Sequence, residues 1–143
     1  MKLSEVEPLF EKLPVVCQHR VLFGEVDKMN LVYGSHYLTW FEHGRNEYLR
    51  RCGLPYTEVE KRGLALPAFE AHVWYLSPVS YDDLVDIRCA VTSCARATAL
   101  FVFSIECGGR RVAAGYTHHV CLNAERKPVR LPDWLRDAIL ERY

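Results

Sequence analysis

Residues 23–52 read FGEVDKMNLVYGSHYLTWFEHGRNEYLRRC, and we expect the rest of the chain to be arranged around them. An acidic residue, Asp27, closes an apolar run, and a loop of small residues follows it. A long, aromatic-rich helical pattern then begins at Tyr37. This order places one carboxylate and one glycine, Gly34, near a helix N-terminus. Such a layout suits a reaction that develops negative charge on an oxygen.

The predicted helix covers residues 37–52 and has informative residues at its end and in its middle. Gly53 stands where a left-handed cap residue belongs, and Pro55 prevents the helix from continuing. Gly44 lies mid-helix, where glycine costs about 1 kcal/mol relative to alanine. We therefore expect this helix to lie tightly against a sheet. Its apolar stripe consists of Tyr37, Phe41, Tyr48 and Cys52.

Strand patterns occupy most of the remaining chain. Gly108-Gly109 is a signal for a two-residue hairpin, and Gly115 indicates a bulge or a close contact. Because the later strands follow one another without alternating helices, a doubly wound parallel fold is excluded and the fold class is α+β. The predicted strands are residues 15–23, 66–76, 84–93, 97–107 and 110–122, and short helices are predicted at residues 56–62 and 132–140.

The composition is that of one globular domain over residues 1–143. Lysine plus arginine equals aspartate plus glutamate at 18 each, so the net charge gives no argument for nucleic acid or a membrane surface. No apolar run approaches the ~20 residues of a membrane span, and the acidic N-terminus is unlike a secretory signal. The six cysteines form no Cys-x-x-Cys pair, which favours free thiols in the cytoplasm over disulfides or a metal site.

Residues 27–33 read DKMNLVY and residues 37–45 read YLTWFEHGR. They are similar to the Asp-x-x-Gly-x-Val-Tyr motif, and to the aromatic helix with a Glu-x-x-Arg ending, of the hotdog-fold acyl-CoA thioesterases. Within that group the chain resembles the 4-hydroxybenzoyl-CoA thioesterase-like family, from about residue 20 to residue 132. The resemblance implies a five-stranded antiparallel sheet wrapped around one long central helix. Three further segments match in order: SPVSYDD at 77–83, AAGYTH at 113–118 and KPVRLP at 127–132.

The resemblance also implies a site. In such enzymes the aspartate after the first strand is catalytic, which corresponds to Asp27. A backbone N–H at the start of the central helix, here that of Gly34, polarises the thioester carbonyl. The family's active sites form between subunits, so a homodimer or homotetramer is implied, and we expect no metal and no cofactor.

The chain departs from the family pattern at two positions. The usual glycine three residues after the aspartate is Asn30, and asparagine tolerates a positive φ better than most residues. At Gly34 many bacterial relatives with short-chain acyl-CoA activity carry a histidine. In this chain the histidine, His36, lies two residues further on.

A carboxylate at Asp27 can act on a thioester in two ways. It can attack the carbonyl to give a mixed anhydride, or it can act as a general base on water, and the sequence leaves both routes open. The first-turn N–H groups of the helix can stabilise the oxyanion, because they have no partner within the helix. By position alone, an aspartate at a strand end is also typical of a turn.

Five more residues are candidates for substrate contacts: Tyr33, His36, Tyr37, His72 and Trp74. The two tyrosines can line an acyl pocket, although aromatic residues at helical spacing are also typical of a core. His36 either contacts substrate near the carbonyl or faces solvent. His72 and Trp74 share one face of a predicted central strand, from which they can reach an acyl group.

His118 and His119 are adjacent on a predicted strand and therefore face opposite ways, which argues against their binding one metal ion together. The sequence as a whole predicts a cytoplasmic acyl-CoA thioesterase that releases a carboxylic acid and free CoA. Two alternatives stay open: a thioesterase acting on acyl carrier protein, and a non-catalytic module that binds acyl thioesters.

Overall fold

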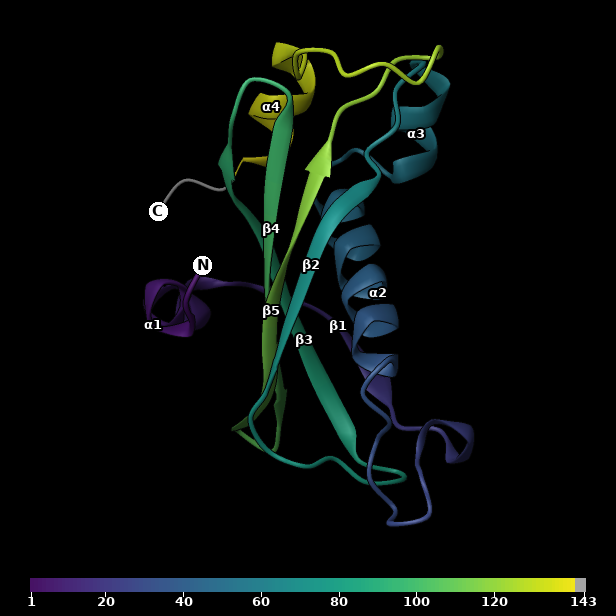
Figure 1. Cartoon of the computed structure of the whole chain (residues 1–143), viewed down its shortest axis with the longest axis vertical. Helices are drawn as coiled ribbons and strands as arrows, with labels where there is room; N and C mark the ends of the chain where they lie inside the picture. Colours follow the sequence, from purple (N-terminus) through teal and green to yellow (C-terminus); the bar gives the residue numbers. More distant parts are fainter. Residues whose placement is uncertain (141–143) are drawn as a thin grey trace.

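A five-stranded antiparallel sheet wraps around the long helix α2 (His36–Arg51) in the computed structural model, which describes residues 1–140 (Figure 1). The predicted α+β class and the central helix are confirmed. The strands are β1 (Val15–Arg20), β2 (Ala68–Tyr75), β3 (Leu84–Cys94), β4 (Thr98–Cys107) and β5 (Arg110–Val120). The shorter helices are α1 (Leu3–Val6), η1 (Glu7–Lys12), η2 (Phe23–Glu25), α3 (Tyr56–Lys61) and α4 (Asp133–Ile139), where η denotes a 3-10 helix. No helix within residues 1–140 is long and apolar enough to cross a membrane.

The strands lie in the order β1-β3-β4-β5-β2, and every neighbouring pair is antiparallel. β2 is therefore an edge strand, so the prediction that His72 and Trp74 lie on a central strand is wrong. The connection over residues 76–83 carries the chain from β2 to β3, which pairs with β1 and β4 rather than with β2. Strand order depends on such long-range pairing, which the alternation of side chains does not reveal.

Two glycines let α2 approach the sheet closely, as predicted from their positions. A Cβ at Gly44 of α2 would lie 2.7 Å from Cγ2 of Ile87 in β3. A Cβ at Gly115 of β5 would lie 2.6 Å from the ring of Phe41, which itself stacks on Phe103 with ring centroids 4.3 Å apart. At both glycines the backbone packs directly against a side chain of the facing element, and there is no room for an added methyl group.

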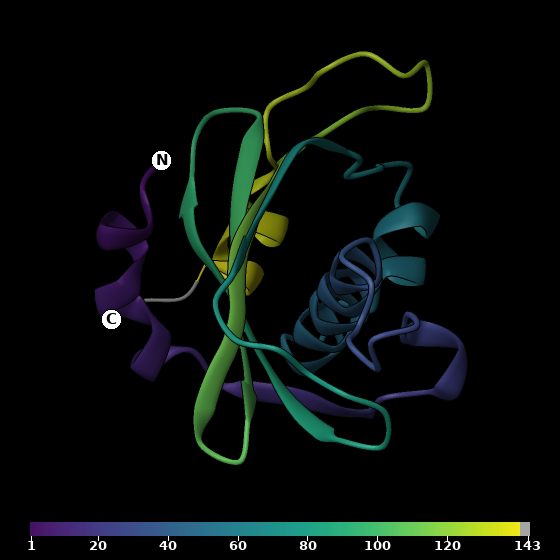
Figure 2. The ribbon, with the colours of Figure 1, turned by 60° about the horizontal axis from the view of Figure 1, so that its bottom comes forward.

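The opposite face of the sheet is partly covered by the N-terminal segment. Figure 2 shows α1 and η1 (purple) on the side of the sheet away from α2. The guanidinium of Arg111 in β5 lies 4.6 Å from the ring centroid of Phe10, and Arg88 of β3 donates a hydrogen bond of 2.6 Å to the carbonyl oxygen of Leu13. These contacts hold the segment against the sheet.

Element boundaries differ from the predictions where a side chain accepts backbone hydrogen bonds. The first strand ends at Arg20, because the Glu25 carboxylate accepts the N–H of Leu22 at 2.7 Å and the chain turns into η2. The helix α2 begins at His36, one residue before the predicted start. Gly53 has a φ of +79°, which confirms it as the left-handed residue after the helix.

Candidate active site

Asp27 begins a short loop that is closed by a β-bridge between Val26 and Val32. Oδ1 of Asp27 accepts hydrogen bonds from the N–H groups of Met29 at 2.8 Å and Leu31 at 3.2 Å. Within residues 1–140 no hydrogen-bond donor contacts Oδ2, and the side chain is exposed. One carboxylate oxygen therefore shapes the loop, and the other is available to a ligand.

Asn30 fixes the middle of this loop. Its φ is +60°, a left-handed conformation that asparagine tolerates better than most residues. Its side-chain oxygen also accepts a hydrogen bond of 3.2 Å from the N–H of Tyr81, in the connection between β2 and β3. A glycine could supply the backbone conformation but not this anchor.

The N-terminus of α2 presents several free backbone donors. The N–H of His36 donates to the carbonyl oxygen of Tyr33 at 3.0 Å. The N–H groups of Gly34, Ser35 and Tyr37 donate to no atom within residues 1–140, as is usual for the start of a helix. Together with the positive end of the helix dipole, they can stabilise negative charge on an oxygen.

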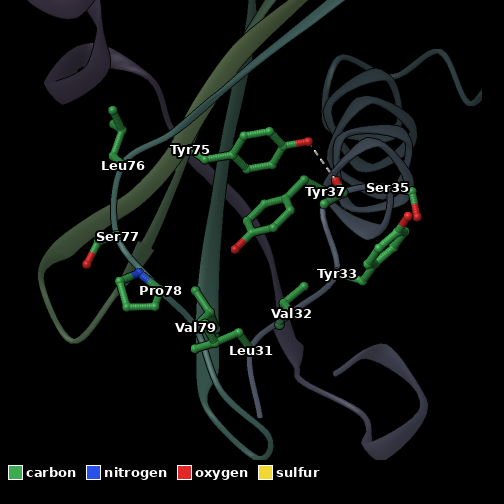
Figure 3. Close-up of a pocket in the computed structure, with 11 residues that line it drawn as sticks. Leu31, Val32, Tyr33, Ser35, Tyr37, Tyr75, Leu76, Ser77, Pro78 and Val79 are labelled. Atoms are coloured by element: carbon green, nitrogen blue, oxygen red, sulfur yellow. Dashed lines mark hydrogen bonds between the residues drawn. The ribbon is translucent and has the colours of Figure 1, made fainter. Parts of the chain in front are cut away.

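A cavity of about 720 Å³ opens beside this helix terminus (Figure 3). One wall comes from residues 31–35 and Tyr37, and the other comes from residues 75–79 at the end of β2 and beyond it. Valine, leucine, proline and tyrosine side chains line most of the surface. The volume is in the range of small-molecule pockets, whose walls are mostly apolar with a few placed polar groups.

Tyr37 and Tyr75 meet inside the cavity, with ring centroids 5.2 Å apart and an interplanar angle of 78°. The hydroxyl of Tyr75 donates a hydrogen bond of 2.9 Å to the carbonyl oxygen of Gly34, shown as a dashed line in Figure 3. Burial and the neighbouring Tyr75 raise the pKa of Tyr37 to about 12, so its phenol is protonated at neutral pH. In Figure 3 that hydroxyl points into the cavity, where it can donate a hydrogen bond to a ligand.

The structure brings some of the predicted residues together. Tyr33, Gly34 and Tyr37 line the cavity. Asp27 does not line the cavity. It begins the loop that ends at Leu31, and Leu31 does line the cavity. His36 lies outside the lining and packs edge-on against the ring of Tyr33, with centroids 6.4 Å apart.

His72 and Trp74 lie away from the cavity. Val73, between them, pairs with Gly115, whose Cα faces Phe41 of α2. Alternation along β2 therefore directs His72 and Trp74 to the sheet face opposite α2, where their ring centroids are 4.6 Å apart. The sheet separates both side chains from the cavity of their own chain.

Tyr75 and Glu25 belong to this region but are not among the sequence candidates. Tyr75 could have been found as the residue that shares the helix-facing side of β2 with Val73. Glu25 had a weaker signal, an acidic residue just before the proposed catalytic one. Its hydrogen bonds join segments that are separated in sequence, which residue patterns do not reveal.

His118 and His119 face opposite sides of β5, as predicted. His118 stacks on Phe69 with centroids 5.4 Å apart, whereas His119 is fully buried and contacts the carbonyl oxygen of Leu66 at 2.8 Å. Burial lowers the pKa of His119 to about 4. In the part of the chain that the structure describes, no three His, Cys, Asp or Glu residues are grouped so that they could hold a metal ion.

Residues 21–139 match the thioesterase-like superfamily. A protein of Aquifex aeolicus (strain VF5) is 31% identical over 120 residues, which cover 84% of this chain and 93% of that protein. The acyl-CoA thioesterase YbgC of Haemophilus influenzae is 27% identical over 121 residues, which cover 83% of this chain and 89% of the relative. The crystal structure of the DHNA-CoA thioesterase from Staphylococcus aureus matches with a TM-score of 0.79 and 28% identity, over 85% of both chains. This chain therefore belongs to the thioesterase-like superfamily and has the hotdog fold of its thioester hydrolases.

Proposed function

We propose that this protein hydrolyses an acyl-CoA thioester to a carboxylic acid and free CoA. The observation that carries the proposal is the meeting of a mostly apolar cavity with the unbonded N–H groups at the start of α2. The cavity suits an acyl group, and the helix terminus suits the carbonyl oxygen next to it. The relationship to proteins named acyl-CoA thioesterases supports this substrate class.

The N–H of Gly34, with those of Ser35 and Tyr37 beside it, polarises the thioester carbonyl. These donors are held in place before the reaction, so they interact most strongly when charge develops on the oxygen in the transition state. Removing one such donor from an enzyme typically costs ~100-fold or more in rate. The N–H groups belong to the backbone, which explains why the site needs no particular side chain at Gly34.

Asp27 supplies the remaining chemistry through Oδ2. As a general base, it takes a proton from a water molecule while the water oxygen attacks the carbonyl carbon; the C–S bond then breaks and the thiolate of CoA takes up a proton. As a nucleophile, Oδ2 attacks the carbonyl carbon and displaces the thiolate, and water then hydrolyses the mixed anhydride to the acid and free Asp27. Label in the Asp27 carboxylate after a single turnover in water enriched in ¹⁸O identifies the nucleophilic route. The nucleophilic route, with water attacking the Asp27 side of the anhydride, labels the Asp27 carboxylate, whereas the general-base route labels only the acid product.

We also propose that two copies of the chain associate along β2 and complete the site, as a homodimer or a homotetramer. β2 is an edge strand whose side chains are mostly exposed, and an uncovered edge presents a row of unpaired backbone groups. The exposed carboxylate of Asp27 then acts at the interface between the copies. We assign the enzyme to the cytoplasm, because all six cysteines are free thiols.

The activity is tested by measuring thiol release from acyl-CoA substrates of several chain lengths and of aryl types, and from acylated acyl carrier protein. We expect release from at least one acyl-CoA and its loss in Asp27→Ala, with the oligomer still folded. Release from the carrier-protein substrates alone would reassign the substrate. Calorimetric binding without release from any substrate would identify a non-catalytic binding module instead.

A further inference from the structure

The carboxylate of Glu25 lies just outside the cavity and joins three parts of the chain. Oε1 contacts Nε2 of His19 in β1 at 2.7 Å and accepts the N–H of Leu22 at 2.7 Å. Oε2 accepts the indole N–H of Trp40 in α2 at 2.8 Å. The side chain is only 11% exposed, so a carboxylate with fewer partners would be costly at this position.

The backbone of Glu25 connects the same carboxylate to both halves of the proposed active site. Its carbonyl oxygen accepts the N–H of Tyr33 at 2.9 Å, immediately before Gly34. Asp27 follows Glu25 by two residues, at the start of the loop that the Val26–Val32 bridge closes. Glu25 therefore lies where the aspartate loop and the start of α2 are joined.

The charge state of Glu25 agrees with this set of contacts. Burial by itself raises the pKa of the carboxyl group. The hydrogen bonds from Leu22, His19 and Trp40 outweigh that effect and leave the pKa below its usual value. At neutral pH the group is a carboxylate whose two oxygens both accept hydrogen bonds.

We propose that Glu25 is a positioning residue that fixes the Asp27 carboxylate relative to the N–H donors at the start of α2. One oxygen holds the segment that leads to Asp27, and the other holds α2 through Trp40, so the two reacting parts share one anchor. This inference rests on the proposed thioesterase function. Neither Glu25 nor Trp40 lines the cavity, so both act through Asp27 and the helix terminus without touching substrate.

Two substitutions break the anchor in different ways. Glu25→Gln keeps the shape of the side chain, but its amide N–H₂ must face either the indole N–H of Trp40 or the N–H of Leu22, which leaves two donors opposed. Trp40→Phe removes the indole N–H from the Oε2 side, together with part of the buried ring, and keeps an aromatic ring beside Tyr37. Tyr48→Phe is the matched control, since it removes the buried hydrogen bond of 2.5 Å from Tyr48 to the carbonyl oxygen of Ile139, at the far end of α2.

The experiment measures kcat and KM on an acyl-CoA that the wild-type chain hydrolyses, after thermal unfolding has shown that each variant is folded. We expect Glu25→Gln and Trp40→Phe to lower kcat roughly 10- to 100-fold, the cost of misplacing reacting groups by about 1 Å, with little change in KM. The double variant should lose little more than either single one, because both break the same link. Tyr48→Phe should lose stability and keep its kcat. A kcat in Trp40→Phe equal to that of Tyr48→Phe would overturn the proposal, even if Glu25→Gln does not fold.

Hydrogen exchange of the Tyr33 amide gives a second readout that does not depend on activity. We expect this amide to exchange faster in Glu25→Gln and Trp40→Phe than in wild type and in Tyr48→Phe. Faster exchange in a chain that hydrolyses no thioester would refute the thioesterase function while retaining Glu25 as the anchor of this loop. Unchanged exchange would refute the anchor itself.

Discussion

The hydroxyl of Tyr75 donates a hydrogen bond of 2.9 Å to the carbonyl oxygen of Gly34, across 41 positions of sequence. This bond joins the end of the edge strand β2 to the turn that precedes α2. The carbonyl of Gly34 is held by Tyr75, and the N–H of the same residue is left without a partner in residues 1–140. The contact therefore orients the peptide groups that we assign to the carbonyl of the substrate.

Tyr75→Phe should weaken catalysis without unfolding the protein. The ring still fills the cavity wall, but the Gly34 carbonyl loses its donor, so we expect a loss of about 0.5–1.5 kcal/mol in the free energy of unfolding and a roughly 2- to 10-fold lower kcat. Urea unfolding and thiol-release kinetics measure the two effects. A kcat equal to that of wild type would show that the hydrogen bond does not orient the turn.

Gly34→Ala should impair the site by crowding. A Cβ there would lie 3.0 Å from the hydroxyl oxygen of Tyr75 and 3.3 Å from its Cζ, so the tyrosine must shift. We expect kcat to fall in Gly34→Ala and to recover in part when Tyr75→Phe is added, because the closest atom is then gone. Fully additive losses in the double variant would contradict a direct conflict between the two side chains.

Asp27→Asn separates the structural role of that side chain in the loop from its proposed role in catalysis. The amide oxygen can still accept the N–H groups of Met29 and Leu31, so the loop is expected to keep its shape. The atom that replaces Oδ2 can neither attack a carbonyl nor take a proton from water, and kcat should fall at least ~100-fold. Circular dichroism and the oligomeric state should match wild type. Retained turnover in this variant would remove Asp27 from the mechanism.

Gly44→Ala should destabilise the fold despite the higher helix propensity of alanine. The added Cβ meets Cγ2 of Ile87 at 2.7 Å, and overpacking of a filled core costs about 1–3 kcal/mol. Gly24→Ala is the matched control, since nothing lies within 4 Å of its Cβ and the change should stay within about 0.5 kcal/mol. Chemical denaturation compares the two variants. Equal stability would mean that α2 can move away from β3 without cost.

The protein should lose stability on acidification because of His119. Its pKa lies at about 4 in the folded chain, below its ordinary value of 6.5, since burial disfavours the charged ring. Above pH 6.5 the ring is neutral in both states. As the pH falls toward 4 only the unfolded chain takes up the proton, which lowers the free energy of unfolding by up to about 3 kcal/mol.

His119→Asn tests this assignment, because the asparagine amide can replace the contact with the Leu66 carbonyl but does not titrate. The variant should have a lower stability at pH 7 and a shallower decline between pH 6.5 and 4. Denaturation at several pH values measures both slopes. Parallel curves for wild type and variant would assign the acid sensitivity to other groups.

Much of the fold follows from local patterns in the sequence. The helical stripe predicts α2 to within one residue at each end, and the alternation in the second half predicts the strands. Gly44, Gly53 and Gly108 were informative because each has a backbone or packing requirement that other residues meet poorly. The errors occur where tertiary hydrogen bonds override local preference, as at η2, where the Glu25 carboxylate ends the first strand early.

The amino-acid sequence alone determines the element types, the family and the chemical character of Asp27 and the helix terminus, because these depend on neighbours a few residues away. Only the tertiary structure decides that β2 lies at the edge, that His72 and Trp74 are separated from the cavity by the sheet, and that Tyr75 contacts Gly34. It also decides that Glu25 joins β1, η2 and α2. These relationships depend on which distant strands pair, and pairing is set by packing the whole sheet around α2, which no short stretch of sequence encodes.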